Sequence, residues 1–99
     1  MNEVQGHRKL SDDDLKDPGD FYFAPLADLP GEFILYFKCP CGNDEVAGIH
    51  VGDKRKPRSH RPSWEWNGDF DKPTCKPSIL RRGGCKWHGY LTDGVFKSV

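Results

Sequence analysis

Four side chains suited to metal binding stand in two close pairs along the chain. The first pair is Cys39 and Cys41, with Pro40 between them, and the second is Cys85 and His88, with two residues between them. Structural zinc sites take four thiolate or imidazole ligands in a tetrahedron, and close ligand pairs separated by a long gap are their usual layout. The spacing therefore predicts one structural Zn²⁺ ion held by these two cysteines, Cys85 and His88.

The alternative is that the cysteines are buried thiols and that His88 is an ordinary strand histidine. The 43 residues between Cys41 and Cys85 favour the metal, because an ion that closes so long a loop constrains the unfolded chain strongly. Cys75 is a rival ligand. It lies in an extended segment flanked by prolines, without a tight turn, so we expect a buried thiol there.

Length and composition also favour a stabilising metal. Of the 99 residues 35% are hydrophobic and 11 are glycines, so one domain with a modest core is expected. Residues 1–20 are polar and acidic, unlike a secretory leader, and no apolar run approaches the roughly 20 residues of a membrane span. We expect a cytoplasmic protein without membrane contact, in which cysteines serve as ligands or thiols rather than disulfides.

The pattern of apolar residues predicts a mainly β fold, a small zinc-stabilised sheet of hairpins with zinc-ribbon-like knuckles and little helix. Residues 1–20 are expected to form a flexible acidic tail, and residues 21–99 a single zinc-binding β domain. A hairpin of residues 32–38 and 45–51 carries the first cysteine pair at its tip, and residues 87–96 form the last hairpin. Residues 73–80 contain prolines that suit a sheet edge. Further extended segments are predicted at 21–26 and 63–67.

Charge is unevenly distributed although the net charge is zero. Residues 1–53 carry 11 acidic and 4 basic side chains, whereas residues 54–99 carry 4 acidic and 11 basic ones. If the fold keeps the halves apart, an acidic and a basic surface face different partners. The alternative is that the two halves interleave and neutralise each other.

These features favour a non-enzymatic interaction module, because four protein ligands leave zinc no open position for a catalytic water. Its protein partner would contact exposed aromatic side chains, for which the candidates are Trp64, Trp66, Trp87 and Tyr90, although core packing competes for at least half of them.

The second hypothesis is a nucleic-acid-binding protein that uses the basic loop 54–61, and the third is a zinc-dependent hydrolase. Basic loops beside aromatic side chains hold phosphates and stack bases. The candidate contacts to nucleic acid or to an acidic partner are Lys54, Arg55, Lys56, Arg58, Arg61, Arg81 and Arg82. No residues are assigned to catalysis.

Several ordered motifs carry a resemblance to a known family. They are Phe37-Lys38-Cys39-Pro40-Cys41-Gly42, Trp64-x-Trp66-Asn67-Gly68, Lys72-Pro73-Thr74, Lys76-Pro77-Ser78-Ile79-Leu80, Gly84-Cys85-x-x-His88 and Leu91-x-Asp93-Gly94. Residues 29–97 resemble a family of uncharacterised small phage and mobile-element proteins, some labelled ammonia monooxygenase without support in these residues. The resemblance implies a β-rich zinc domain with the four ligands named above and leaves the function open. For the interaction module we expect a phage or mobile-element accessory protein that acts on a host or phage factor.

Overall fold

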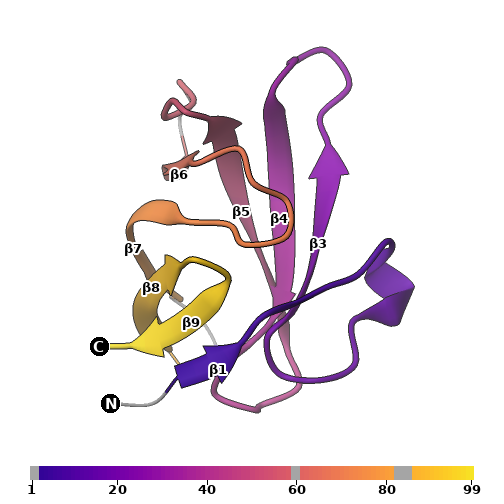
Figure 1. Ribbon diagram of the computed structural model, residues 1–99, viewed down its shortest axis with the longest axis vertical. Coiled ribbons are helices and arrows are strands. Elements are labelled where there is room, and N and C mark those ends of the chain that lie inside the picture. Colours follow the sequence, from indigo (N-terminus) through magenta and orange to yellow (C-terminus); the bar gives the residue numbers. More distant parts are fainter. Residues whose placement is uncertain (1–2, 59–60, 82–85) are drawn as a thin grey trace.

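The computed structural model describes residues 3–58, 61–81 and 86–99, which form one sheet of nine strands (Figure 1). The order across the sheet is β1-β9-β8-β7-β6-β5-β4-β3-β2. The mainly β prediction is thus confirmed, whereas stabilisation by zinc stays a prediction. No helix in this part of the chain is long and apolar enough to cross a membrane. The elements are β1 Glu3–Gln5, β2 His7–Arg8, the 3₁₀ turn η1 Asp12–Asp14, β3 Asp20–Pro25, β4 Glu32–Lys38, β5 Val46–Asp53, β6 Ser63–Trp66, β7 Cys75–Leu80, β8 His88–Thr92 and β9 Val95–Ser98.

The hairpin of β4 and β5 is the longest antiparallel pair of the sheet, with Leu35 opposite Ile49 and Phe37 opposite Ala47. Leu35 and Phe37 are fully buried, because alternate residues of a strand point to the same face and this face is the inner one. The turn that joins the strands carries the first cysteine pair, as predicted.

Aromatic side chains fill the space inside the curved sheet. Phe23, Phe33, Trp66 and Phe70 pack with ring centroids 4.8–5.9 Å apart; Phe23 and Trp66 are buried, and Phe33 and Phe70 are partly buried against them. Trp87 is buried in the same core. Two of the four aromatic residues proposed as a contact surface, Trp66 and Trp87, therefore belong to the core. Trp64 is half-buried and Tyr90 exposed.

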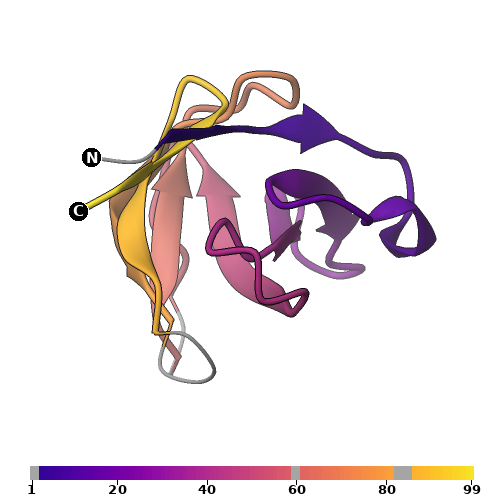
Figure 2. The same cartoon turned by 90° about the horizontal axis from the view of Figure 1, so that it is seen from below.

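The N-terminal residues pair with strands near both ends of the sheet order. β1 pairs antiparallel with β9, and β2 pairs parallel with β3, so that one short segment bonds to strands at opposite ends of the order. Between them Gly6 donates its N–H to the carbonyl of Gly94 at 2.8 Å. A Cβ atom at position 6 would lie 2.5 Å from that oxygen, so glycine is required by the close approach. Figure 2 shows the segment crossing the mouth of the nearly closed sheet.

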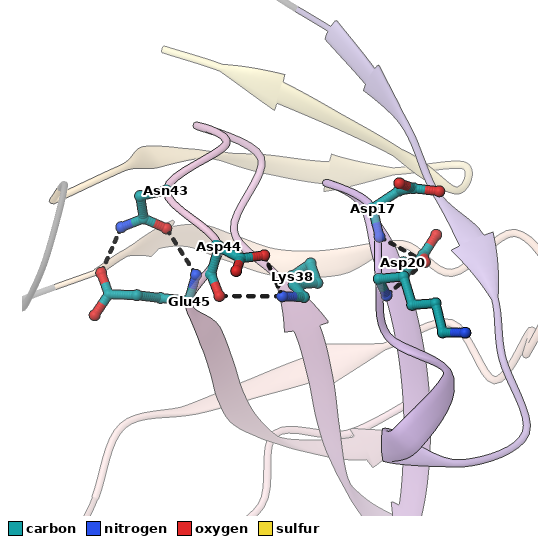
Figure 3. Close-up of polar contacts among 7 residues, drawn as sticks. Asp17, Asp20, Lys38, Asn43, Asp44 and Glu45 are labelled. Carbon is teal, nitrogen blue, oxygen red and sulfur yellow. Dashed lines mark hydrogen bonds and ion pairs between the residues drawn. The ribbon is translucent and has the colours of Figure 1, made fainter.

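The prediction of a flexible acidic tail is therefore wrong for residues 3–20. Leu15 is buried, and the Asp20 carboxylate, 1% exposed, accepts hydrogen bonds from the N–H groups of Lys16 at 3.0 Å and Asp17 at 2.9 Å (Figure 3). The pattern was misleading because the strands here are only three and two residues long. So short a strand has no detectable periodicity.

Strand β7 lies inside the sheet, between β6 and β8, and not at an edge as its prolines suggested. The proline is accommodated because pairing is interrupted beside it. Only Glu65–Lys76 and Trp66–Cys75 are paired between β6 and β7. On the other side the register between β7 and β8 shifts between Cys75 and Ile79. Pro77 and Ser78 fall within this irregular part.

Candidate active site

Ser78 and His88 form a hydrogen-bonded pair on the outer face of β7 and β8. The Nε2 atom of His88 lies 3.0 Å from the Oγ atom of Ser78. Their neighbours Ile79 and Gly89 are buried, whereas His88 is exposed and Ser78 half-buried. Since side chains alternate between the faces of a strand, the fold that buries these neighbours directs the pair toward solvent.

The arrangement of the pair suits nucleophilic catalysis. A serine hydroxyl is a weak nucleophile until an adjacent base takes its proton, and heavy-atom distances of about 2.6–3.2 Å serve that transfer. With its own proton on Nδ1, the imidazole of His88 accepts the hydrogen bond of Ser78 through Nε2. Because His88 is exposed and Ser78 is only half-buried, the reacting oxygen is within reach of a substrate.

The other serines that the structure describes are occupied differently. Ser11 donates to the Asp14 carboxylate at 3.2 Å, and Ser63 donates to the Pro57 carbonyl at 2.7 Å. The Ser98 hydroxyl accepts a hydrogen bond from the indole of Trp87 at 3.0 Å. Within residues 3–58, 61–81 and 86–99, Ser78 is thus the serine whose hydroxyl is hydrogen-bonded to a histidine.

A second histidine, His50, is bound to a carboxylate, and no serine hydroxyl of the described residues is hydrogen-bonded to it. Its Nε2 atom lies 2.7 Å from Glu32, and the guanidinium of Arg55 lies 2.7 Å from the other oxygen of the same carboxylate. Burial opposes ionisation of Glu32, yet the hydrogen bonds from His50 and Arg55 prevail and hold the pKa of Glu32 below its ordinary value. Ser63 stands opposite His50 in the sheet, but its buried hydroxyl is directed at Pro57. We interpret this cluster as structural.

The cysteine turn brings the first predicted ligand pair together. The Sγ atoms of Cys39 and Cys41 lie 3.1 Å apart, the first buried and the second exposed. Cys85 lies outside the described residues, and the imidazole of His88 contacts Ser78. Among the described residues no group of three or more histidine, cysteine or acidic side chains is placed to hold a metal ion. The zinc site stays a prediction.

Polar side chains fix the conformation of the cysteine turn (Figure 3). The ammonium of Lys38 lies 2.5 Å from the Asp44 carboxylate, the amide of Asn43 bonds the carboxylate of Glu45, and Glu45 donates its N–H to Asn43 at 3.1 Å. Gly42 has a φ of 85°, which a side chain would disfavour. These contacts within the turn do not involve an ion.

Cys75 is buried, as predicted, with 2% of its surface exposed. Desolvation raises the pKa of its thiol to about 12. A thiol that remains protonated at neutral pH is a poor metal ligand and a poor nucleophile. Cys75 is part of the core beside Leu91, its partner on β8.

The basic residues proposed as nucleic-acid contacts do not form one uniform surface. Arg55 binds Glu32 and also donates to the Pro30 carbonyl at 3.2 Å, and Arg81 is half-buried 3.8 Å from Glu45. Arg82 lies outside the described residues. Exposed side chains are found at Lys54, Arg55, Lys56, Arg58 and Arg61.

A comparison with protein families matches residues 7–99 to BubE, described as a bacterial ubiquitination-like system serine protease. Searches of curated proteins and of solved structures found no significant match. The match overturns two predictions, a non-enzymatic interaction module and the absence of an enzymatic activity, because the family is one of enzymes. It also offers no support for a phage or mobile-element origin.

Both residues of the candidate pair stand in motifs that the sequence analysis singled out, but the serine was not assigned a role. Ser78 stands in the Lys76-Pro77-Ser78-Ile79-Leu80 motif, and His88 ends the Cys-x-x-His motif, where it was assigned to zinc. Nothing in the spacing of the two motifs shows that adjacent strands bring them within hydrogen-bonding distance.

Proposed function

The chain belongs to the BubE family of bacterial ubiquitination-like system serine proteases, and we propose that it hydrolyses peptide bonds with Ser78 as nucleophile and His88 as general base. The observation that carries the proposal is the 3.0 Å hydrogen bond between Ser78 Oγ and His88 Nε2. Since the family is described as a serine protease of a bacterial ubiquitination-like system, we propose that the substrate is a protein of such a system.

In this mechanism His88 Nε2 accepts the proton of Ser78 as Oγ attacks the carbonyl carbon of the scissile peptide bond. The C–N bond of the tetrahedral intermediate then breaks, and the imidazolium returns its proton to the leaving amine. Water attacks the resulting acyl ester with His88 again as base. Cleavage of the ester bond to Oγ releases the carboxylic acid and restores the hydroxyl of Ser78.

The exposed position of the pair favours a polypeptide substrate. The residues that the structure describes enclose no pocket, whereas sites for small molecules are concave and bury most of the ligand. A flexible, extended segment of a protein can reach an exposed serine on a sheet surface. The tail of a folded protein is a substrate of this kind.

The proposal is tested with a fluorophosphonate probe, which phosphonylates activated serines. We expect labelling of the purified protein at Ser78, complete loss of labelling in Ser78→Ala, and a decrease of about 10³-fold or more in His88→Gln, because removal of a catalytic base costs that much in related systems. Ser63→Ala serves as the control, since the Ser63 hydroxyl is buried against a carbonyl. Equal labelling of Ser78→Ala and the unchanged protein would refute the assignment.

For the cofactor, we propose that Cys39 and Cys41 supply two ligands of any structural zinc and that His88 is left to catalysis. A tetrahedral ion with Zn–S bonds near 2.3 Å separates two thiolates by about 3.8 Å, so the 3.1 Å between the sulfurs of Cys39 and Cys41 would have to widen slightly. His88 Nε2 cannot bind zinc and accept the proton of Ser78 at the same time. His88 Nε2 therefore cannot serve both as one of the four predicted zinc ligands and as the base of the serine mechanism.

A further inference from the structure

The main chain at Ser78 lacks regular strand pairing on the side of β6. The antiparallel register set by Glu65–Lys76 and Trp66–Cys75 would place Trp64 opposite Pro77, but the pairing ends before this point. Pro77 has no N–H group to donate to a neighbouring strand. Regular strand pairing therefore does not fix the nucleophile from this side.

On the side of β8 the pairing is irregular as well. The register defined by Cys75–Leu91 differs from that defined by Ile79–Gly89 and Leu80–His88, so Ser78 lies where the ladder shifts. Irregularities of this kind redirect a side chain and are common next to active sites. The same feature leaves the position of Ser78 dependent on contacts other than the ladder.

Trp64 supplies such a contact. Its indole Nε1–H donates a hydrogen bond to the carbonyl oxygen of Ser78 at 3.1 Å, and its ring is half-buried against the hydrophobic core. A side chain anchored in the core thus replaces the missing main-chain bond at the nucleophile itself. Little conformational freedom remains for the indole, because its ring is packed.

We propose that Trp64 is a positioning residue that holds the main chain of Ser78 so that Oγ stays within reach of His88. The inference rests on the proposed function and adds a third residue to its machinery. Trp64 does not contact the reacting atoms, so its loss should lower the rate of the chemical step and leave substrate binding unchanged.

The test compares two tryptophans of the same strand. Trp64→Phe and Trp66→Phe each remove one indole hydrogen bond to a backbone carbonyl, that of Ser78 in the first case and that of Asp69 at 3.0 Å in the second. We expect fluorophosphonate labelling of Ser78 to slow about tenfold in Trp64→Phe, because small displacements of a reacting group are costly. With a peptide substrate kcat should fall by the same factor and KM should not change.

A shape-preserving variant separates positioning from packing. Replacement of residue 64 or 66 by 3-benzothienylalanine keeps two fused rings but substitutes sulfur for the N–H group. Slower labelling with this residue at position 64 and not at position 66 supports the inference. Unchanged labelling at position 64, or equal slowing at both positions, overturns it. Labelling that persists in Ser78→Ala would instead refute the proposed function, so the two failures are distinguishable.

Discussion

Leu91→Ala should destabilise the fold strongly, whereas Leu80→Ala should leave its stability nearly unchanged. Leu91 on β8 is fully buried between its strand partners Cys75 and Phe96, and Leu80 on β7 is 52% exposed. Truncation of a buried leucine costs about 2–5 kcal/mol through lost transfer energy and the cavity that remains. Truncation of a half-exposed leucine costs about 0.5 kcal/mol or less.

We therefore expect a difference of about 3 kcal/mol between the two variants, against a total stability of about 5–15 kcal/mol for a domain of this size. In a chain of 99 residues this lowers the midpoint of thermal unfolding by roughly 12–24 °C for Leu91→Ala. Circular dichroism during heating, together with urea unfolding of both variants, measures the difference.

The two variants test the strand register that exposes Ser78 and His88. Because the side-chain period of a strand is two, a slip of β8 by one residue would turn His88 inward and Leu91 outward, and a slip of β7 by one residue would turn Leu80 inward. Equal destabilisation by the two variants, or a larger effect of Leu80→Ala, would refute the described register. The proposal for Ser78 and His88 would then lose its geometric basis.

Three further predictions concern titration and metal binding. Because burial raises the pKa of Cys75 to about 12, only ~10⁻⁴ of this thiol is ionised at pH 8, so iodoacetamide should modify it only after unfolding, as mass spectrometry of digests can verify. The lowered pKa of Glu32 contributes stability that is present above its ordinary pKa of 4.5 and is lost as pH falls through the lower value of the folded state. Glu32→Gln should therefore unfold at lower urea concentration at pH 7 and show a smaller further loss between pH 5 and pH 3; an acid dependence identical to that of the unchanged protein would contradict the ion-pair assignment. Finally, zinc per chain measured by mass spectrometry should be the same in His88→Gln as in the unchanged protein and should fall in Cys39→Ser. Loss of zinc in His88→Gln would show that His88 is a ligand and not the partner of Ser78.

The strands with strong local patterns could be predicted from the sequence. The β4–β5 hairpin has a run of five apolar residues from Phe33 to Phe37, and the last hairpin has a turn at Asp93-Gly94, so local residue types fix both. The prediction that residues 73–80 lie at a sheet edge was wrong, because Pro77 favours an edge strand but β7 lies between β6 and β8. An interruption of pairing that accommodates proline inside the sheet depends on β6 and β8 and has no local signature.

The candidate site was missed for a similar reason. The hydrogen bond between Ser78 and His88 joins adjacent strands, and a histidine near a cysteine favours a metal site when the sequence is considered alone. The short strands β1 and β2 were missed because their partners β9 and β3 are defined only in the folded chain. The contact between Ser78 and His88 and the pairing of β1 and β2 therefore depend on tertiary contacts, which the local residue types do not determine.

Closure of the sheet by residues 3–8 has a consequence for the order of folding. Glu3 pairs with Lys97, so this contact joins positions near the two ends of the sequence, and it cannot form until synthesis has passed β9. Local hairpins such as β4–β5 and β8–β9 can pair earlier, since closing a short loop costs less entropy than closing a long one. The edge of β9 that β1 covers therefore stays unpaired until residues 3–5 dock on it, whereas β2 can pair with the nearby β3 earlier.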